Sequence, residues 1–296
     1  MGDGVQLGAA TERPIESNRV PASRSPYAET RLVQSQTIEE SMFQLRPANP
    51  LLLLLLLFSG PLTIANTVSI QESKKKVAFA NPHLLVSTDW LAEHRGDKGV
   101  VVVDARSAKD FEGGHVQDAV NISTSDTYDP NARGSIGPAE QIAKLLGSQG
   151  ISPSTHVVLY DGGKSTAAAR VFWTFEVYGH GKVSVLDGGL AKWKHEERDL
   201  TKDATKVAAV KYEVGANPGR LSTLDQMMED LESEEVVMLD ARSTGEYDAG
   251  RIPAAVRIEW FHNYTSGDVP VFKSPEELLK LYGDQGVTSD KRVHAY

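Results

Sequence analysis

The sequence predicts an α/β protein with two similar domains, each built on a mostly parallel sheet that helices cover on both faces. Short β-branched runs alternate with helical segments, a pattern typical of parallel sheets. The segment 100–107 recurs as 236–243, an offset of 136 residues, and so long a period indicates a duplicated domain. The 296 residues, 40% apolar and 24% charged, suffice for two ordinary cores.

Residues 1–76 are expected to lie outside both domains. Residues 1–41 are polar and lack apolar periodicity, which is typical of a disordered tail. In 42–65 a basic start precedes the apolar run Leu51–Phe58, and small residues precede a possible cleavage after Ala65. This is the layout of a secretory signal peptide, and the apolar run is too short for a permanent membrane span. The sequence therefore predicts a periplasmic or secreted protein; a cytoplasmic or mitochondrial location is the alternative.

The first domain is expected at 77–200. Ser87 is an N-cap signal for a helix that runs to His94, and Pro138 stands in the first turn of another helix. The continuous β-branched runs read as strands buried on both faces. The expected elements are strands at 100–103, 157–160 and 183–186, and helices at 88–94, 138–146 and 167–178.

A linker at 201–220, with Gly215, Pro218 and Gly219, precedes a second domain at 221–296. Its expected elements are strands at 236–239 and 293–296 and a helix at 275–282. The repeat ends before counterparts of the loop at 161–166, the helix after it and the strand at 183–186. The second domain is therefore predicted to be incomplete.

Chemistry is expected at the loop Asp161–Thr166, which joins a buried strand to a helix. In parallel sheets, ligands bind beyond the carboxyl ends of the strands. A glycine-containing turn that opens a helix directs several backbone N–H groups toward one point, which favours an anion there.

Several motifs carry a family resemblance. Asp-Ala-Arg ends a strand at 104–106 and again at 240–242, Gly-His-Val and Gly-Arg-Ile follow, and Leu186–Trp193 reads Leu-Asp-Gly-Gly-Leu-Ala-Lys-Trp. With these motifs, residues 84–296 resemble tandem rhodanese-type sulfurtransferases. In that family the first domain is usually inactive, with Asp or another residue heading the loop, and Asp161 matches this. The second domain carries a catalytic Cys, and the resemblance implies that it directly follows Tyr296, the last residue of this chain.

The resemblance also implies candidate binding residues. Arg242 matches an arginine that faces the pocket and can hold an anionic donor such as thiosulfate or 3-mercaptopyruvate. A structural ion pair with Asp240 or Glu246 is the alternative. Arg251 is a weaker candidate, and Glu246 stands where some members have a second Arg, which bears on donor preference.

Composition excludes several classes of function. The chain has no cysteine, which rules out disulfides, thiolate metal sites and a thiol nucleophile within these residues. A net charge of −9 without a basic stripe argues against nucleic-acid binding. We expect no metal site, no cofactor and no permanent membrane span. The predicted partners are a small anionic sulfur donor and a thiophilic acceptor.

The predicted function is transfer of a sulfane sulfur through a Cys persulfide, with the nucleophile missing from these 296 residues. The alternative is a non-catalytic rhodanese-like module that binds or regulates a partner.

Overall fold

The computed structural model describes residues 77–296 except 133 and 216. The predicted tail and signal segment at 1–76 lie outside the described residues. Within the described part of the chain, no helix has the length and apolar character needed to cross a membrane.

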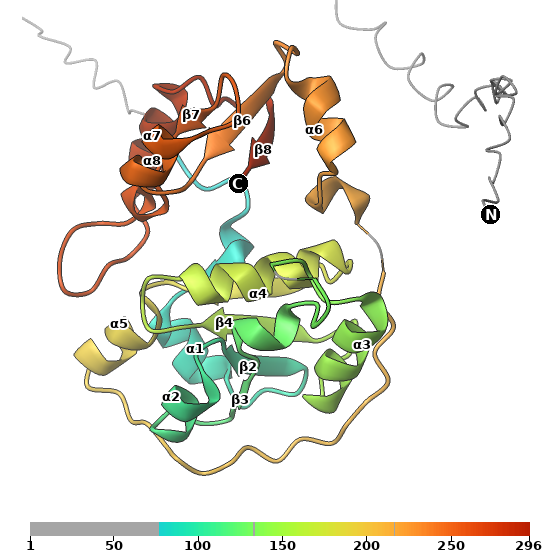
Figure 1. Cartoon of the computed structure of the whole chain (residues 1–296). Coiled ribbons are helices and arrows are strands. Elements are labelled where there is room, and N and C mark those ends of the chain that lie inside the picture. The colour runs from blue at the N-terminus through green and yellow to red at the C-terminus, as the bar shows by residue number, and fades with distance from the viewer. Residues whose placement is uncertain (1–76, 133, 216) are drawn as a thin grey trace, which may run out of the picture. The chain divides into compact units, whose positions relative to one another are not determined.

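The first domain contains a five-stranded parallel sheet (Figure 1). Its spatial order is β1-β5-β4-β2-β3, so β4 and β5 lie inside the sheet. The burial of these strands agrees with their central position, because every residue of β5 and all but one residue of β4 are buried. The strands are β1 (Leu85–Val86), β2 (Val100–Asp104), β3 (Ala119–Asn121), β4 (His156–Tyr160) and β5 (Val183–Leu186).

Helices cover both faces of this sheet. One face packs against α3 and α4, where Ile142, Leu146 and Phe175 are buried. The other face packs against α1 and α5, through residues such as Leu91 and Trp193. The helices are α1 (Thr88–His94), α2 (Ala108–Glu112), α3 (Ala139–Ser148), α4 (Thr166–Val177) and α5 (Gly189–His195), with 3-10 turns η1 (Pro82–Leu84) and η2 (Thr124–Thr127).

The predicted linker segment packs closely on the first domain. Tyr212 is 6% exposed and belongs to the core on the α3–α4 side. The N–H of Val210 donates to the carbonyl of Gly147 at 2.9 Å. A Cβ added at Gly147 would lie 2.4 Å from the carbonyl oxygen of Val210, so only glycine fits this approach. Regular structure in 201–220 begins at η3 (Pro218–Arg220).

The second domain repeats the first domain as far as β4, without a counterpart of the two-residue β1. Its parallel sheet has the order β7-β6-β8. Helix α6 starts 136 residues after α1, and β6 and β8 start 136 residues after β2 and β4. The elements are α6 (Leu224–Asp230), β6 (Val236–Asp240), α7 (Thr244–Ala249), β7 (Val256–Arg257), η4 (Trp260–Asn263), α8 (Pro275–Gly283) and β8 (Arg292–Ala295).

The predicted fold class is therefore confirmed: the protein is α/β with two parallel sheets, of which the second is smaller. Strand β8 is an edge strand here, whereas its counterpart β4 is flanked on both sides. Val293 in β8 is accordingly 37% exposed, but Val157 at the matching position in β4 is 0% exposed.

Candidate functional site

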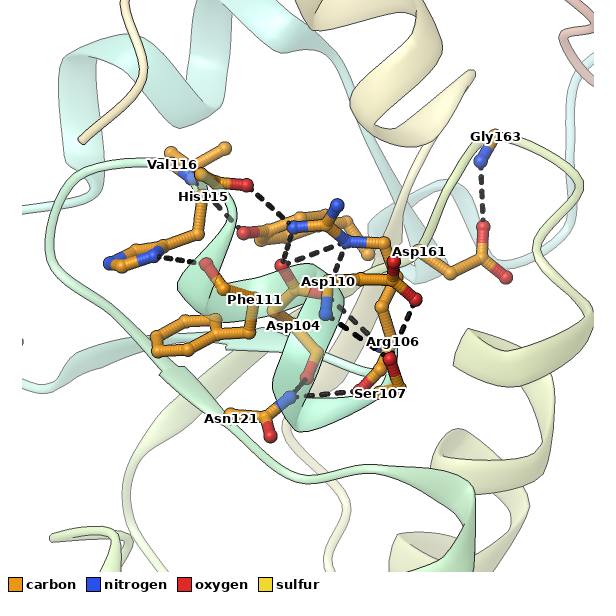
Figure 2. Close-up of polar contacts among 12 residues, drawn as sticks. Asp104, Arg106, Ser107, Asp110, Phe111, His115, Val116, Asn121, Asp161 and Gly163 are labelled. Carbon is orange, nitrogen blue, oxygen red and sulfur yellow. Dashed lines mark hydrogen bonds and ion pairs between the residues drawn. The ribbon is translucent and has the colours of Figure 1, made fainter. Parts of the chain in front are cut away.

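A buried aspartate–arginine pair stands at the carboxyl end of β2. The guanidinium of Arg106 donates to both oxygens of Asp104, with 2.9 Å from Nε to Oδ1 and 2.5 Å from Nη2 to Oδ2. Nη2 also donates to the carbonyl of Gly114 at 2.8 Å (Figure 2). The bidentate fork explains why Asp-Ala-Arg is found here, because lysine could not match both oxygens.

The second domain reproduces this arrangement at β6. Arg242 donates to Asp240 from Nε at 3.0 Å and from Nη2 at 2.5 Å, and Nη2 reaches the carbonyl of Gly250 at 2.8 Å. Its guanidinium also lies 5.1 Å from the ring centroid of Tyr296. The hydrogen bonds from Arg242 lower the pKa of the Asp240 carboxyl to about 2, against the opposing effect of burial.

The candidate donor-binding residue Arg242 therefore has a structural partner, which is the alternative that the sequence also allowed. Its side chain is 34% exposed, compared with 15% for Arg106. Nη1 makes no hydrogen bond to any described residue, so one edge of the guanidinium can still receive an anion. The role of Arg242 in donor binding stays a prediction.

Glu246 has a local structural function. Its carboxylate accepts from the N–H and the hydroxyl of Ser243, which forms the capping box of α7. The hydrogen bonds from Ser243 lower the pKa of Glu246. Arg251 is exposed, and its guanidinium lies 4.5 Å from the ring centroid of Tyr247.

The predicted anion-binding loop is present in the first domain, and its ligand is the chain's own carboxylate. Oδ1 of Asp161 accepts from the N–H group of Gly163 at 2.9 Å (Figure 2). It also accepts from the N–H group of Ser165 at 3.0 Å. Oδ2 accepts from Ala167 at 3.0 Å and Ala168 at 3.3 Å, in the first turn of α4. Asp161 is 4% exposed, so these four donors satisfy a buried charge.

The Gly188-Gly189 pair of the Leu186–Trp193 motif packs against the backbone of the Asp161–Thr166 loop. The N–H of Leu190 donates to the carbonyl of Asp161 at 2.8 Å. A Cβ at Gly189 would lie 2.8 Å from that carbonyl oxygen, and Gly189 has a φ of +51°. The motif therefore holds the loop against the start of α5, and glycine is required for the close approach.

The ends of β8 and β4 share one backbone contact. The carbonyl of Tyr160 accepts from the N–H of Ala105 at 2.8 Å, and the carbonyl of Tyr296 accepts from Ala241 at 2.9 Å. The residue that follows Tyr160 is Asp161.

Sequence reasoning missed one polar network in the second domain. His294 on β8 is 7% exposed and lies 2.7 Å from the hydroxyl of Ser222 and 2.8 Å from the carboxylate of Asp230. These three residues are far apart in the sequence, so no motif or spacing predicts that they lie together. The first domain has valines, Val86 and Val158, where Ser222 and His294 stand, so this network is not required by the fold.

Comparison with known proteins agrees with these motifs. The model of the rhodanese-like domain matches residues 87–196 and 223–296. The chain belongs to the rhodanese family. It is 30% identical over 236 residues to a protein named "Putative thiosulfate sulfurtransferase" from Saccharopolyspora erythraea, covering 74% of this chain and 83% of that protein. It is 33% identical over 242 residues to the "Sulfur carrier protein TtuD" of Thermus thermophilus, covering 74% and 84%.

Solved structures show the same rhodanese fold. The crystal structure of SseA from Escherichia coli, described under 3-mercaptopyruvate sulfotransferases, aligns with a TM-score of 0.63 and 25% identity. The alignment covers 72% of this chain and 87% of SseA. An anaerobic ergothioneine biosynthesis enzyme from Chlorobium limicola aligns with a TM-score of 0.65 at 22% identity. This similarity shows a shared fold only.

Proposed function

We propose that this rhodanese-family protein transfers a sulfane sulfur from thiosulfate or 3-mercaptopyruvate to a thiophilic acceptor. The nucleophile would be a cysteine that directly follows Tyr296 in an extended chain. The observation that supports the proposal is the matching contact pattern of Tyr160 and Tyr296, because the residue after Tyr160, Asp161, heads the loop of the first domain.

The chemistry requires a thiol at that position. With thiosulfate, the thiolate attacks the outer sulfur, the S–S bond breaks, and sulfite leaves with the electron pair. The resulting persulfide then passes its outer sulfur to a nucleophile such as cyanide, which regenerates the thiolate and releases thiocyanate. Backbone N–H groups and a helix N-terminus around the cysteine favour the thiolate. Arg242, with its free Nη1, is the proposed contact for the donor's negative charge.

The decisive experiment extends the chain with its downstream coding sequence. The 296-residue chain contains no cysteine and should show no transfer from thiosulfate to cyanide. The extended chain should turn over by double displacement with a trappable persulfide, and Cys→Ser at the new position should abolish turnover without unfolding the protein. Asp, Gly or Ser encoded after Tyr296 would favour the alternative, a non-catalytic binding module. Turnover by the 296-residue chain itself would overturn the mechanism.

We also propose export, on the basis of the signal-like segment at 42–65. Cleavage after Ala65 would give a mature protein that starts at Asn66 and acts in the periplasm or outside the cell. Mass spectrometry of the mature N-terminus tests this, because residues 1–41 retained in an exported protein would contradict it.

A further inference from the structure

A buried histidine fastens the linker segment to the first domain. His180 lies in the turn between α4 and β5 and is 2% exposed. Its Nδ1 lies 3.0 Å from the hydroxyl of Tyr212 in the linker segment, and its Nε2 lies 3.0 Å from the carbonyl oxygen of Thr155. Its ring also meets that of Phe175 edge to face, with the centroids 5.0 Å apart. One imidazole therefore joins α4, the loop before β4 and the linker segment.

The linker segment depends on a small number of anchors. In the described chain it forms no helix or strand between α5 and η3, and it runs along the outside of the first domain (Figure 1). The N–H of Val210 donates to the end of α3 at 2.9 Å, and the N–H of Gly215 donates to the carbonyl of Tyr178 at 3.0 Å. Tyr212 lies between these two contacts, and among the described linker residues it is the one with a buried side chain.

The partners of His180 define where its ring carries a hydrogen. A carbonyl oxygen only accepts, so Nε2 carries the hydrogen and donates it to Thr155. Burial raises the pKa of the Tyr212 hydroxyl to about 12, so this hydroxyl keeps its proton and donates it to Nδ1. Both nitrogens of the neutral imidazole are therefore satisfied while the linker segment is docked.

A second proton on the imidazole disrupts this arrangement. Nδ1 then becomes a donor directed at the Tyr212 hydroxyl, and the hydroxyl has to turn its own hydrogen away from the ring. Among the described residues, the Tyr212 hydroxyl has no hydrogen-bond partner besides His180. Its hydrogen would be buried without an acceptor, which destabilises the docked state.

The surroundings of His180 also disfavour a positive charge. Burial lowers the pKa of the imidazole, and the nearby cationic groups of His156 and Lys182 act in the same direction, whereas hydrogen bonding to the carbonyls of Thr155 and Lys182 opposes it. Within the part of the chain that the structure describes, no carboxylate forms an ion pair with His180. The charged ring is therefore favoured where water can reach it, which requires Tyr212 to move away.

We propose that protonation of His180 releases the linker segment from the first domain. Release lengthens the free chain between the two domains, so acid gives the second domain a longer tether. The undocked ring titrates near the ordinary value of 6.5, so docking is fully stable above this pH and loses stability as the pH falls below it. The proposal is independent of sulfur transfer, because it uses no residue of the candidate site.

His115 contacts the start of the linker segment and responds in the opposite sense. Its Nδ1 lies 2.9 Å from the carbonyl oxygen of Phe111, and its Nε2 lies 3.2 Å from that of Asp203. Both partners only accept, so an added proton finds an acceptor at His115. Acid release should therefore begin at Tyr212 and leave the end near Asp203 attached.

Hydrogen exchange of the full 296-residue chain measures this release. The protection of the Val210 amide, taken relative to its intrinsic exchange rate at each pH, reports docking because this N–H donates to Gly147. We expect the protection to fall about tenfold between about pH 7.5 and about pH 5, since uptake of one proton changes an equilibrium by up to about tenfold per pH unit. The amides of Val103 in β2 and of Thr201 beside His115 should keep their protection over this range.

Two histidine variants assign the effect. His180→Gln retains a side chain that can donate to Thr155 and accept from Tyr212 but does not titrate, so the protection of Val210 should no longer depend on pH. His156→Gln is the matched control, because this histidine bonds to Ser184 on β5 and titrates without a hydrogen bond to the described linker residues. It should show the same fall in protection as the parent.

Three results would overturn the proposal. They are constant protection of Val210 in the parent, a fall that persists in His180→Gln, and a fall that disappears in His156→Gln. If His180→Gln unfolds by circular dichroism, the parent decides by nuclear magnetic resonance. The fall in Val210 protection must then level off at the pH at which the His180 ring titrates, and a fall that stops above this pH or continues below it contradicts the proposal.

Discussion

The hydroxyl of Tyr296 accepts a hydrogen bond from the N–H of Ile252 at 3.0 Å, as the hydroxyl of Tyr160 does from Val116 at 3.1 Å. Each tyrosine thus ties the end of its strand, β4 or β8, to the loop that follows the domain's second helix. In the first domain this tie is fully buried, and it fixes the backbone immediately before Asp161. The same tie in the second domain holds the last described residue in the corresponding place.

Removal of these hydroxyls should reveal how much each tie contributes. Tyr160→Phe leaves the N–H of buried Val116 without its acceptor, which costs about 1–3 kcal/mol of unfolding free energy. Tyr296→Phe should cost less, because Tyr296 is half-buried and water can replace the hydroxyl. Denaturant unfolding of both variants measures the difference. A larger loss from Tyr296→Phe than from Tyr160→Phe would contradict this reasoning.

Acid should destabilise the second domain through Asp240. Hydrogen bonds from Arg242 lower the pKa of Asp240 from 3.8 to about 2 in the folded state. A lowered carboxyl pKa stabilises the folded state above the unfolded pKa, and that contribution is lost as the pH falls from about 4 to about 2. Hydrogen exchange of the β6 amides across this range measures the loss. Asp225→Asn, at an exposed carboxylate of α6, should leave the profile unchanged, whereas Asp240→Asn should remove this component of it.

The two domains should differ in independent stability. Residues 77–217 contain a complete sheet with helices on both faces, and we expect them to fold alone and resist protease. Residues 221–296 have an exposed edge at β8, and Leu224 and Leu279 are 72% and 62% exposed. Expressed alone, this segment should be cleaved rapidly or aggregate. Equal proteolytic resistance of the two segments would refute the expectation.

The boundary of the first domain gives a sharper form of this prediction. A segment that ends at residue 200, the boundary expected from sequence, lacks Tyr212. That side chain is 6% exposed and its hydroxyl lies 3.0 Å from Nδ1 of His180. Burial of a large aromatic side chain contributes on the order of 3 kcal/mol, so residues 77–200 should unfold at lower denaturant than residues 77–217. Tyr212→Ala in 77–217 should reproduce most of the loss.

The sequence predicts the buried strands well because their pattern is local. Val100–Val103 and Val236–Leu239 are continuous apolar runs, and both are central or near-central parallel strands. Strand β1 has only two residues, Leu85–Val86, which is too short for any periodicity to be visible. The packing of the linker segment also escapes prediction, because it depends on the non-local contact between Val210 and Gly147.

The sequence predicts the loop at Asp161–Thr166 better than it predicts the side-chain contacts around the candidate site. A strand–glycine turn–helix pattern is enough to predict the anion cradle around Asp161. Only the structure shows that Arg242 forms a bidentate ion pair with Asp240. The repeated Asp-Ala-Arg motif predicts this pair as one of two alternatives.

Cysteine at position 161 would measure the electrostatics of the first-domain loop directly. The chain contains no other thiol, so Asp161→Cys creates a unique reporter. The N–H groups of Gly163, Ser165 and Ala167 now donate to a carboxylate, and they should favour a thiolate in its place. The thiol should therefore titrate below the usual value of about 8.5. Alkylation by iodoacetamide as a function of pH gives the midpoint.

Lys164→Cys is the matched control, because this residue lies on the same loop and is exposed. Its thiol should titrate near the usual value. The two variants differ in accessibility, but accessibility scales the alkylation rate at every pH and leaves the midpoint of the profile unchanged. Equal midpoints for the two thiols would show that the loop does not stabilise a thiolate at residue 161. Its N–H groups would then fit a carboxylate there without favouring anions in general. A lower midpoint at residue 161 would show that the first-domain loop stabilises the anionic form of the residue that follows Tyr160.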